Sequence, residues 1–314
     1  MSITTALCEK MLTGKSELLS FSHTVPRRYK TYYIKKRNST EMRLIAHPAK
    51  TVKFIQRLAV EELRNYFPIH HCATAYEKGT GIKMNAFQHR RNQYLLKMDF
   101  KNFFLSITPE LFFRVSEDLG VVFDSEDKAL LEGLLFWRLR RNSPLRLSIG
   151  APSSPFVSNL VMYKFDAALC EICESMGVVY TRYADDLTFT TNRKDVLFAI
   201  PDIVRQNLKA QCYSKIRINS EKTVFSSKAF NRHITGVTIT NEGRLSVGRE
   251  RKRLVSALIH KFTLGALSDQ QIENLKGQLA HVKNIEPDFV VRMKKKYSDE
   301  AIAKIFAWKR EGFL

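Results

Sequence analysis

The stretch that decides the fold is TRYADDLTFT, residues 181–190, in which two adjacent carboxylates interrupt a strand-like run. The segments VVYTRY and LTFT that flank the interruption are rich in β-branched and aromatic residues, which favour strands. We therefore expect a β-hairpin whose turn is formed by Ala184 and Asp185. Aspartate is a favoured turn residue in any protein, so this pair alone does not identify a site.

A second carboxylate occurs in a similar setting. Asp99 ends the strand-like run YLLKM and is followed by the aromatic cluster FKNFF. If the two strands lie side by side, Asp99 faces the tip of the hairpin. Carboxylates on rigid strands suit hard Mg²⁺, and two such ions about 3.5–4 Å apart support in-line phosphoryl transfer. The pattern therefore predicts metal-assisted phosphoryl transfer, without separating a polymerase from a nuclease.

The charge balance indicates a polyanionic partner. The 314 residues include 51 Lys and Arg against 31 Asp and Glu, a formal net charge of +20. Basic side chains bind nucleic acid by releasing the counterions condensed on its phosphates, whereas an anionic membrane surface is the alternative partner. Neither a run of ~18 consecutive apolar residues nor a signal-peptide core occurs in the sequence. We expect a cytoplasmic nucleic-acid-binding protein with no membrane partner.

The five cysteines do not suggest a disulfide framework, because their number is odd and a secretory signal is lacking. Cys170 and Cys173 form a C-x-x-C pattern, but the surrounding apolar residues recur at helical spacing. A structural zinc site would need two more ligands, and only the distant His70, His71 and Cys72 could offer them. We favour a buried helix over a zinc site.

The alternation of strand-like and helix-like segments predicts an α+β fold with a sheet covered by helices on one face. A helix is expected within residues 49–67. The C-terminal region is basic and helical, with a capping box formed by Ser268 and Gln271. A narrow apolar stripe follows on the same helix, formed by Ile272, Leu275, Leu279 and Val282.

Four motifs in order resemble those of reverse transcriptases. They are KMDFKNFF at 97–104 (motif A), GAPSSPFVSNL at 150–160 (motif B), YADD at 183–186 (motif C) and INSEKT at 218–223 (motif D). Two further elements, NAFQH at 85–89 and ITG at 234–236, resemble those of retron reverse transcriptases, with Ile234 in place of the usual Val. The resemblance extends from about Arg43 to the basic segment VGRERKRL, and the first forty residues do not align.

The resemblance implies a right-hand polymerase architecture. Residues 1–92 would form an N-terminal region and the fingers. Residues 93–240 would form the palm, with an antiparallel sheet backed by helices and some finger elements inserted around 107–148. Residues 241–314 would form a basic helical thumb.

The resemblance also implies the roles of individual residues. Asp99 and Asp185 would hold two Mg²⁺ ions, for which Mn²⁺ could substitute, together with the Phe100 carbonyl and Asp186. Lys222 would donate a proton to the departing pyrophosphate. The residues expected to contact the incoming dNTP are Arg43, Lys53, Phe104, Ile149 and Gly150. Among them, Phe104 is the expected steric gate against ribonucleotides. Ile149 stands where the family usually has Gln, which leaves nucleotide selectivity open.

The substrate implied by the resemblance is a cognate structured non-coding RNA. Such enzymes prime from the 2′-OH of an internal guanosine and leave a branched RNA–DNA molecule called msDNA. The expected RNA contacts are Asn85, His89, Thr235, Gly236, Arg249, Arg251, Lys252, Arg253, Lys294, Lys295 and Lys296. Asn85 and His89 equally fit capping or core roles, and the basic residues equally fit a solvated face.

Further partners follow only from the family. The residues after the basic segment are too few for a ribonuclease H domain, so we expect a host ribonuclease H to remove the template. An anti-phage role alongside an effector protein encoded nearby is expected by analogy. Two alternatives stay open, namely another class of bacterial reverse transcriptase and a non-catalytic RNA-binding scaffold. Intact Asp99, Asp185 and Asp186 disfavour the scaffold, because carboxylates that repel one another are costly without metal.

Overall fold

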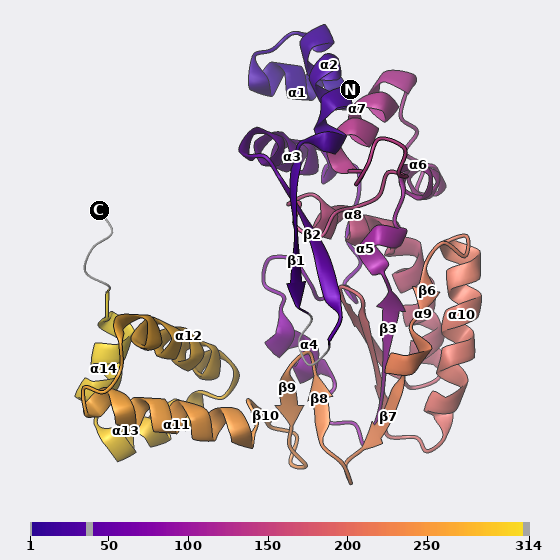
Figure 1. Ribbon diagram of the computed structural model, residues 1–314. Coiled ribbons are helices and arrows are strands. Elements are labelled where there is room, and N and C mark those ends of the chain that lie inside the picture. The colour runs from indigo at the N-terminus through magenta and orange to yellow at the C-terminus, as the bar shows by residue number, and fades with distance from the viewer. Residues whose placement is uncertain (1, 36–39, 310–314) are drawn as a thin grey trace. The chain divides into compact units, whose positions relative to one another are not determined.

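The computed structural model describes residues 2–35 and 40–309, and the chain divides into two compact units (Figure 1). Unit 1 contains Met1–Tyr76 and Leu96–Val224, and unit 2 contains Glu77–Leu95 and Phe225–Leu314. Each unit joins segments that are distant in the sequence. The boundaries expected at residues 92 and 240 therefore do not coincide with those of the compact units, and the division into fingers, palm and thumb stays a prediction.

The N-terminal part of unit 1 is built from helices around a long hairpin. Helix α3 (Lys50–Leu63) confirms the helix expected within residues 49–67, and its buried side chains Val52, Ile55, Ala59 and Leu63 follow helical spacing. Strands β1 (Tyr29–Lys35) and β2 (Met42–Pro48) pair antiparallel. The neighbouring helices are α1 (Ile3–Met11), α2 (Lys15–Thr24), α6 (Pro109–Asp118), α7 (Ser125–Leu135) and α8 (Ser154–Val161).

Asp127 of α7 fixes the start of the chain to unit 1. Its carboxylate accepts hydrogen bonds from the backbone N–H groups of Ile3 and Thr4, at 3.0 and 2.8 Å, and from the Ser2 hydroxyl at 2.7 Å. Burial alone raises the pKa of Asp127, but the hydrogen bonds to the ionised form lower it on balance. An anion at the N-terminus of α1 also interacts favourably with the helix dipole.

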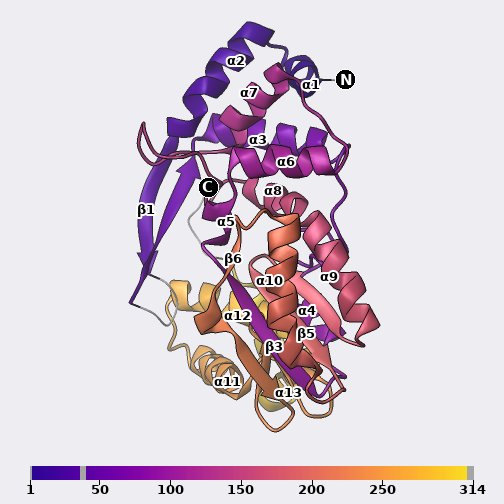
Figure 2. The same cartoon turned by 90° about the vertical axis from the view of Figure 1, so that its right-hand side faces the viewer.

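A β-sheet forms the centre of unit 1, with strand order β4-β5-β3-β6 and with β7 also paired to β3. The strands are β3 (Tyr94–Lys101), β4 (Val179–Tyr183), β5 (Asp186–Thr191) and β6 (Arg217–Ile218), and β7 (Val224–Ser227) begins at the last residue of unit 1. β4 pairs antiparallel with β5, and β3 with β6. Helix α9 (Tyr163–Ser175) packs on β4, and α10 (Ile200–Gln211) packs on β6 (Figure 2). The expected antiparallel sheet backed by helices is confirmed.

Helix α9 also confirms the buried helix expected around the C-x-x-C pattern, because Cys170 and Cys173 are both buried on it. The shorter elements of unit 1 are the helix α5 (Phe103–Ser106) and the 3₁₀ turns η1 (Val25–Arg27), η2 (Val196–Ala199) and η3 (Ser220–Lys222).

Unit 2 combines a small sheet with a helical bundle. The antiparallel strands are β8 (Arg232–Ile234), β9 (Val237–Ile239) and β10 (Leu245–Ser246), and α4 (Ile82–Gln88) packs against them. The bundle contains α11 (Arg249–Thr263), α12 (Asp269–Ile285), α13 (Pro287–Tyr297) and α14 (Asp299–Ala307). The expected capping box of Ser268 and Gln271 is present at the start of α12.

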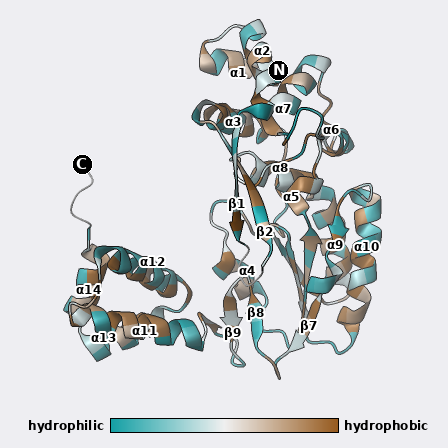
Figure 3. Cartoon of the chain, viewed as in Figure 1, coloured by the Kyte–Doolittle hydropathy of each residue, from teal (hydrophilic) through white to brown (hydrophobic). Residues whose placement is uncertain are grey.

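One buried cluster holds unit 2 together. It includes Ala86 of α4, Ile234 and Val237 of the sheet, and residues of all four bundle helices. The predicted stripe on α12 is confirmed, since Ile272, Leu275, Leu279 and Val282 are all buried. Hydrophobic and hydrophilic residues alternate along these helices (Figure 3), as expected for helices that bury one face. Among the described residues, no helix is long and apolar enough to cross a membrane.

Candidate active site

The predicted hairpin turn is present. Tyr183 of β4 pairs with Asp186 of β5, which leaves Ala184 and Asp185 as a two-residue turn. Ala184 adopts φ 57°, as the tight turns that join antiparallel strands require. Asp185 therefore projects from the end of a rigid hairpin, as the sequence pattern predicts.

Asp99 lies on the strand next to this hairpin. β3 neighbours β5, and the Phe100 N–H donates to the Asp185 carbonyl at 3.1 Å. Desolvation, followed by the charge of Asp99, raises the pKa of Asp185. Although Asp186 remains exposed, desolvation by the surrounding protein and repulsion from Asp185 raise the pKa of Asp186 to about 6. The structure thus gathers three mutually repelling carboxylates in one place.

Such an oxygen-rich, negatively charged cluster fits a hard divalent cation. A bound cation would favour the ionised carboxylates that repulsion and desolvation now disfavour. The arrangement therefore supports the predicted metal role of Asp99, Asp185 and Asp186, and the Phe100 carbonyl belongs to the same strand as Asp99.

Lys222 lies beside the carboxylates. Its ammonium group donates to the Asp99 carboxylate at 3.0 Å, and the Asn219 N–H donates to the Asp99 carbonyl at 2.7 Å. Desolvation lowers the pKa of Lys222, but the hydrogen bond and charge of Asp99 raise it on balance. Lys222 is thus a protonated cation at the carboxylate cluster, a state that a proton donor requires.

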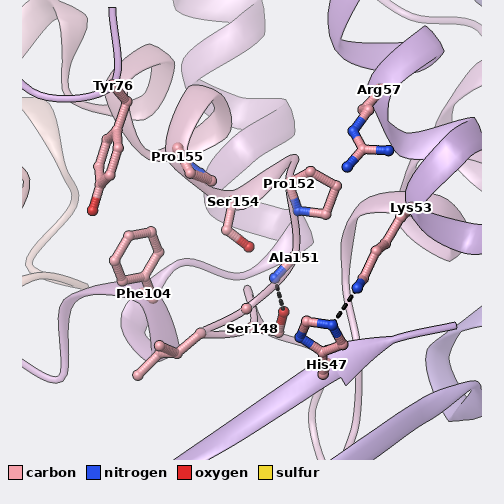
Figure 4. A pocket seen from close by; sticks show the side chains of 12 residues that line it. His47, Lys53, Arg57, Tyr76, Phe104, Ser148, Ala151, Pro152, Ser154 and Pro155 are labelled. Carbon is pink, nitrogen blue, oxygen red and sulfur yellow. Dashed lines mark hydrogen bonds between the residues drawn. The ribbon is translucent and has the colours of Figure 1, made fainter. Parts of the chain in front are cut away.

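A pocket of about 360 Å³ opens in unit 1. Figure 4 shows Lys53 and Arg57 on one side and the rings of Tyr76 and Phe104 on the other. The complete lining is His47, Lys53, Arg57, Tyr76, Phe104, Ser148, Ile149, Gly150, Ala151, Pro152, Ser154 and Pro155. Cations opposite aromatic rings suit a ligand that carries both phosphates and a flat ring.

Four of the five predicted nucleotide contacts line this pocket, namely Lys53, Phe104, Ile149 and Gly150. Arg43 is exposed on β2 and is absent from the lining, although its charge acts to lower the pKa of Asp185. Phe103 is buried, whereas Phe104 is only partly buried and faces the pocket. This difference agrees with Phe103, and not Phe104, being the ordinary core residue.

Gly150 is required by the backbone. Its φ is +130°, and an added Cβ would lie 2.9 Å from the Ala46 carbonyl oxygen. Next to it, the Ile149 carbonyl accepts the Ala46 N–H at 3.0 Å, which joins the pocket floor to β2. Ile149, which departs from the family pattern, therefore lines the pocket, and its backbone is fixed by the hydrogen bond to Ala46.

Four of the lining residues that were not predicted are His47, Arg57, Tyr76 and Ser154. His47 and Lys53 contact each other through their side chains, and Arg57 lies one helical turn beyond Lys53 on α3. That i, i+4 spacing was visible in the sequence. Within residues 2–35 and 40–309, the buried hydroxyl of Ser154 has no hydrogen-bond partner, and Figure 4 shows Ser154 inside the pocket. Tyr76, with φ 71°, gave no such sequence signal.

The Ala184–Asp185 turn is supported from behind by Arg182. Its guanidinium donates to the Ala184 carbonyl at 3.0 Å and to the Asn159 side-chain oxygen at 3.1 Å. The Arg182 N–H donates to the Cys72 carbonyl, and the Thr74 N–H donates to the Arg182 carbonyl, both at 2.8 Å. An arginine in the middle of an apolar strand was the signal that sequence reasoning passed over.

Unit 2 brings the NAFQH and ITG segments together. The Asn85 amide donates to the Thr235 hydroxyl at 3.4 Å, and Thr235 and Gly236 form the β8–β9 turn with φ 46° and 84°. Asn85 and His89 are completely buried, and desolvation lowers the pKa of His89 to about 3. RNA contact, capping and core roles were considered for these two residues; their burial supports the core role, while Thr235 and Gly236 reach the surface.

The predicted basic contacts of the bundle fall into two groups. Lys252 is ion-paired with Glu286 at 3.1 Å, and Arg251 contacts the His281 ring at 2.6 Å, so both serve the packing of unit 2. Lys294 pairs with Asp299 at 2.7 Å but remains exposed. The other exposed members of the prediction are Arg249, Arg253, Lys295 and Lys296.

Known proteins resemble this chain over most of its length. The family model described as reverse transcriptase (RNA-dependent DNA polymerase) matches residues 34–239. The retron Ec83 reverse transcriptase of Escherichia coli is 46% identical over 286 residues, which cover 90% of this chain and 91% of that protein. The retron Ec73 reverse transcriptase of Escherichia coli is 29% identical over 271 residues, which cover 82% and 84%.

Among solved structures, the apo telomerase from Candida tropicalis has a TM-score of 0.52 and 12% identity, with 90% of this chain and 64% of that chain covered. At this identity the likeness concerns the fold alone. It confirms a polymerase arrangement of helices and antiparallel sheets.

Proposed function

Because this chain belongs to the reverse transcriptases of the retron type, we propose that it copies part of a cognate structured non-coding RNA into branched msDNA. As a member of that family it is an RNA-directed DNA polymerase. The finer proposal is that synthesis begins at the 2′-OH of an internal guanosine of the bound RNA. The observation that carries the polymerase chemistry is the meeting of Asp99 with the Asp185–Asp186 turn beside a cationic pocket.

We assign the catalytic roles as follows. Asp99 and Asp185 would hold two Mg²⁺ ions, or Mn²⁺ in their place, with Asp186 and the Phe100 carbonyl completing the oxygen ligands. Divalent ions of this kind stabilise the attacking and leaving oxygens of an in-line phosphoryl displacement. Lys222 is positioned to give a proton to the departing pyrophosphate, since its ammonium group already lies 3.0 Å from Asp99.

The pocket accommodates the incoming dNTP. Lys53 and Arg57 supply positive charge for the triphosphate, and Arg43 on β2 adds to it. Phe104 would exclude a ribose 2′-OH, and Ile149 with Gly150 would form the floor under the sugar. Ile149 cannot donate a side-chain hydrogen bond there, whereas the unpartnered Ser154 hydroxyl can.

The RNA would be held by exposed cations and turns of unit 2. Arg249, Arg253 and Lys294 to Lys296 are available at its surface, and Thr235 and Gly236 present backbone groups at the β8–β9 turn. Recognition of A-form RNA by shape suits such a basic surface. In the cytoplasm, a host ribonuclease H would remove the template, and the msDNA complex would serve anti-phage defence with an effector protein encoded nearby.

The proposal is tested by analysing the nucleic acid that copurifies with the protein. The chain is expressed with its native flanking DNA, purified, and the bound nucleic acid is treated with DNase, RNase and a debranching enzyme. We expect a discrete RNA–DNA species that the debranching enzyme shortens. The matched control is Asp185→Asn, which removes a carboxylate but no phosphate contact, and should retain RNA while lacking DNA.

Each alternative gives a different result. Unbranched DNA copied from RNA would indicate another class of bacterial reverse transcriptase. Bound RNA that is the same in the wild type and in Asp185→Asn, with no DNA in either, would indicate the non-catalytic scaffold.

A further inference from the structure

Away from the catalytic carboxylates, four side chains with metal-binding atoms converge in unit 1 where the loop at residues 70–72 meets α9. They are His71, Cys72, Cys170 and Glu174. The two cysteines are buried, at 3% and 8% exposure, whereas His71 and Glu174 are exposed. The thiols therefore lie at the bottom of a site whose other two ligands reach the surface.

Three distances within this cluster match those between ligands of one tetrahedral ion. His71 Nε2 lies 3.5 Å from Cys72 Sγ and 3.7 Å from Cys170 Sγ, and Glu174 Oε1 lies 3.4 Å from Cys170 Sγ. With Zn–S near 2.3 Å and Zn–N or Zn–O near 2.1 Å, neighbouring tetrahedral ligands are about 3.5–3.8 Å apart. These three pairs of donor atoms already stand at coordination spacing.

The two sulfurs are closer than coordination requires. Cys72 Sγ and Cys170 Sγ are 2.9 Å apart. This distance is longer than a disulfide bond of about 2.0 Å and shorter than the roughly 3.8 Å between two thiolates on one zinc ion. If the two sulfurs moved apart by about 1 Å, a zinc ion could bind between them. If they moved together by about the same amount, they could form a disulfide. The two possible states of this cysteine pair, a zinc site and a disulfide, can be distinguished by experiment.

The chain builds the cluster from two short segments. Cys170 and Glu174 are four residues apart on α9 and so share one face. His71 and Cys72 are adjacent in the loop, where His70 Nδ1 accepts the Cys72 N–H at 3.3 Å and the rings of His70 and His71 lie 4.3 Å apart. The partner of Cys170 is thus Cys72, and not the Cys173 of the C-x-x-C pattern.

We propose that His71, Cys72, Cys170 and Glu174 form a structural zinc site. A mixed set of two thiolates, one imidazole and one carboxylate suits this borderline-soft ion better than Mg²⁺. Burial raises the pKa of both thiols, so they are protonated in the empty site and zinc binding releases two protons.

The site would support the catalytic turn from a distance. The Cys72 carbonyl accepts the N–H of Arg182, and the guanidinium of Arg182 in turn holds the Ala184 carbonyl. An ion shared by Cys72 and Cys170 would therefore fasten the loop to α9 on the side of β4 away from β5. Structural zinc ions contribute directly to folding free energy in this way.

The experiment measures zinc in the full chain prepared without a polyhistidine tag. We expect one zinc ion per chain by elemental mass spectrometry. Replacement by Co²⁺ should give the thiolate-to-cobalt charge-transfer absorption, which reports sulfur ligands and so excludes ions held by the catalytic carboxylates. His71→Ala, at an exposed position, should weaken zinc binding at least tenfold. It should also abolish the rise in Tm that zinc produces in the wild-type protein.

Further variants separate the site from the general effects of losing a buried cysteine. The double variant Cys72→Ser/Cys170→Ser should lose the charge-transfer band, while Cys173→Ser, also buried on α9, should keep both zinc and the band. If the double variant does not fold, Glu174→Ala provides the second surface test, with the same weakening expected as for His71→Ala. A metal-free wild-type protein with two titratable thiols at positions 72 and 170, or with a Cys72–Cys170 disulfide, would overturn the proposal.

Discussion

Arg182 and Asp166 form an ion pair with no exposed surface on either side chain, and their charged atoms lie 2.5 Å apart. Asp166 also accepts the Tyr180 hydroxyl at 2.8 Å, so helix α9 and strand β4 are joined by a satisfied polar network. Since the same guanidinium holds the carbonyl of Ala184, the position of the Ala184–Asp185 turn depends on a carboxylate that is buried behind it.

Asp166→Asn should destabilise unit 1 by about 3–5 kcal/mol, because it leaves the buried Arg182 guanidinium without its counter-charge. Urea denaturation of the metal-free protein measures this loss. The matched control is Asp202→Asn, since the Arg205–Asp202 pair is exposed on both sides, and its loss should cost less than about 1 kcal/mol. Equal losses in the two variants would mean that the buried pair contributes no more than a surface pair.

Ser154→Ala should raise the KM for dNTP without lowering stability. The Ser154 hydroxyl lines the pocket and has no hydrogen-bond partner in the part of the chain that the structure describes, so it is available to a ligand. Loss of one hydrogen bond of about 0.5–1.5 kcal/mol corresponds to a KM raised roughly 2- to 12-fold. Steady-state incorporation on a primed RNA template gives the KM.

Ser153→Ala is the control for that prediction. Ser153 also has a buried hydroxyl that finds no partner among the described residues, but it is not among the lining residues. It should leave the KM for dNTP unchanged, and both variants should keep the wild-type Tm or exceed it. An equal rise in KM for Ser153→Ala would show that the effect is not local to the pocket.

Phe104→Ala should increase the incorporation of ribonucleotides relative to deoxynucleotides, because it removes the ring expected to clash with a 2′-OH. The ratio of kcat/KM for rNTP and dNTP measures the change. Phe103→Ala serves as comparison, since Phe103 is buried and its truncation should cost about 3–5 kcal/mol while leaving the ratio unaltered. Unchanged discrimination in Phe104→Ala would remove the gate assignment.

The metal-free protein should lose stability as the pH rises from about 4 to about 6. Its folded-state pKa for Asp186, about 6, lies above the ordinary value of 3.8, so in this window the folded protein binds more protons than the unfolded chain. Asp186→Asn should lack this part of the pH dependence. The measurement is Tm in the presence of EDTA at several pH values for both proteins.

Added Mg²⁺ should then stabilise the wild-type protein more at pH 7.5 than at pH 5, because the cation binds ionised carboxylates. In Asp186→Asn the difference between the two pH values should shrink. An increase in Tm that is the same at both pH values would contradict binding at these carboxylates.

The hairpin turn, the helix α9 and the capping box of α12 could be predicted because each depends on local chemistry. Each of these patterns lies within one element. They are the β-branched residues of the hairpin, the apolar residues at helical spacing in α9 and the Ser–Gln pair three residues apart at the start of α12. The position of Asp99 next to the turn could also be predicted, because Asp99 and the turn each follow a strand-like run.

What could not be predicted depends on contacts between distant segments. The burial of Asn85 and His89 follows from the packing of α4 on strands more than a hundred residues later. The meeting of Cys72 with Cys170, 98 positions apart, likewise depends on tertiary packing, although the HHC segment was the one source of further ligands that the sequence offered. The positions of these residues in the sequence indicated neither the burial of Asn85 and His89 nor the contact between Cys72 and Cys170.

The discontinuous composition of unit 2 has a consequence for synthesis on the ribosome. Residues 77–95 emerge about 130 residues before the segment from Phe225 onward that completes their core. At roughly 5–20 residues per second, α4 waits on the order of 7–26 seconds for strands β8 and β9 to cover Ala86. The core residues Ala86 and Leu95 thus remain without their later partners for longer than most small domains need to fold, so unit 2 completes its core only after most of the chain has been synthesised.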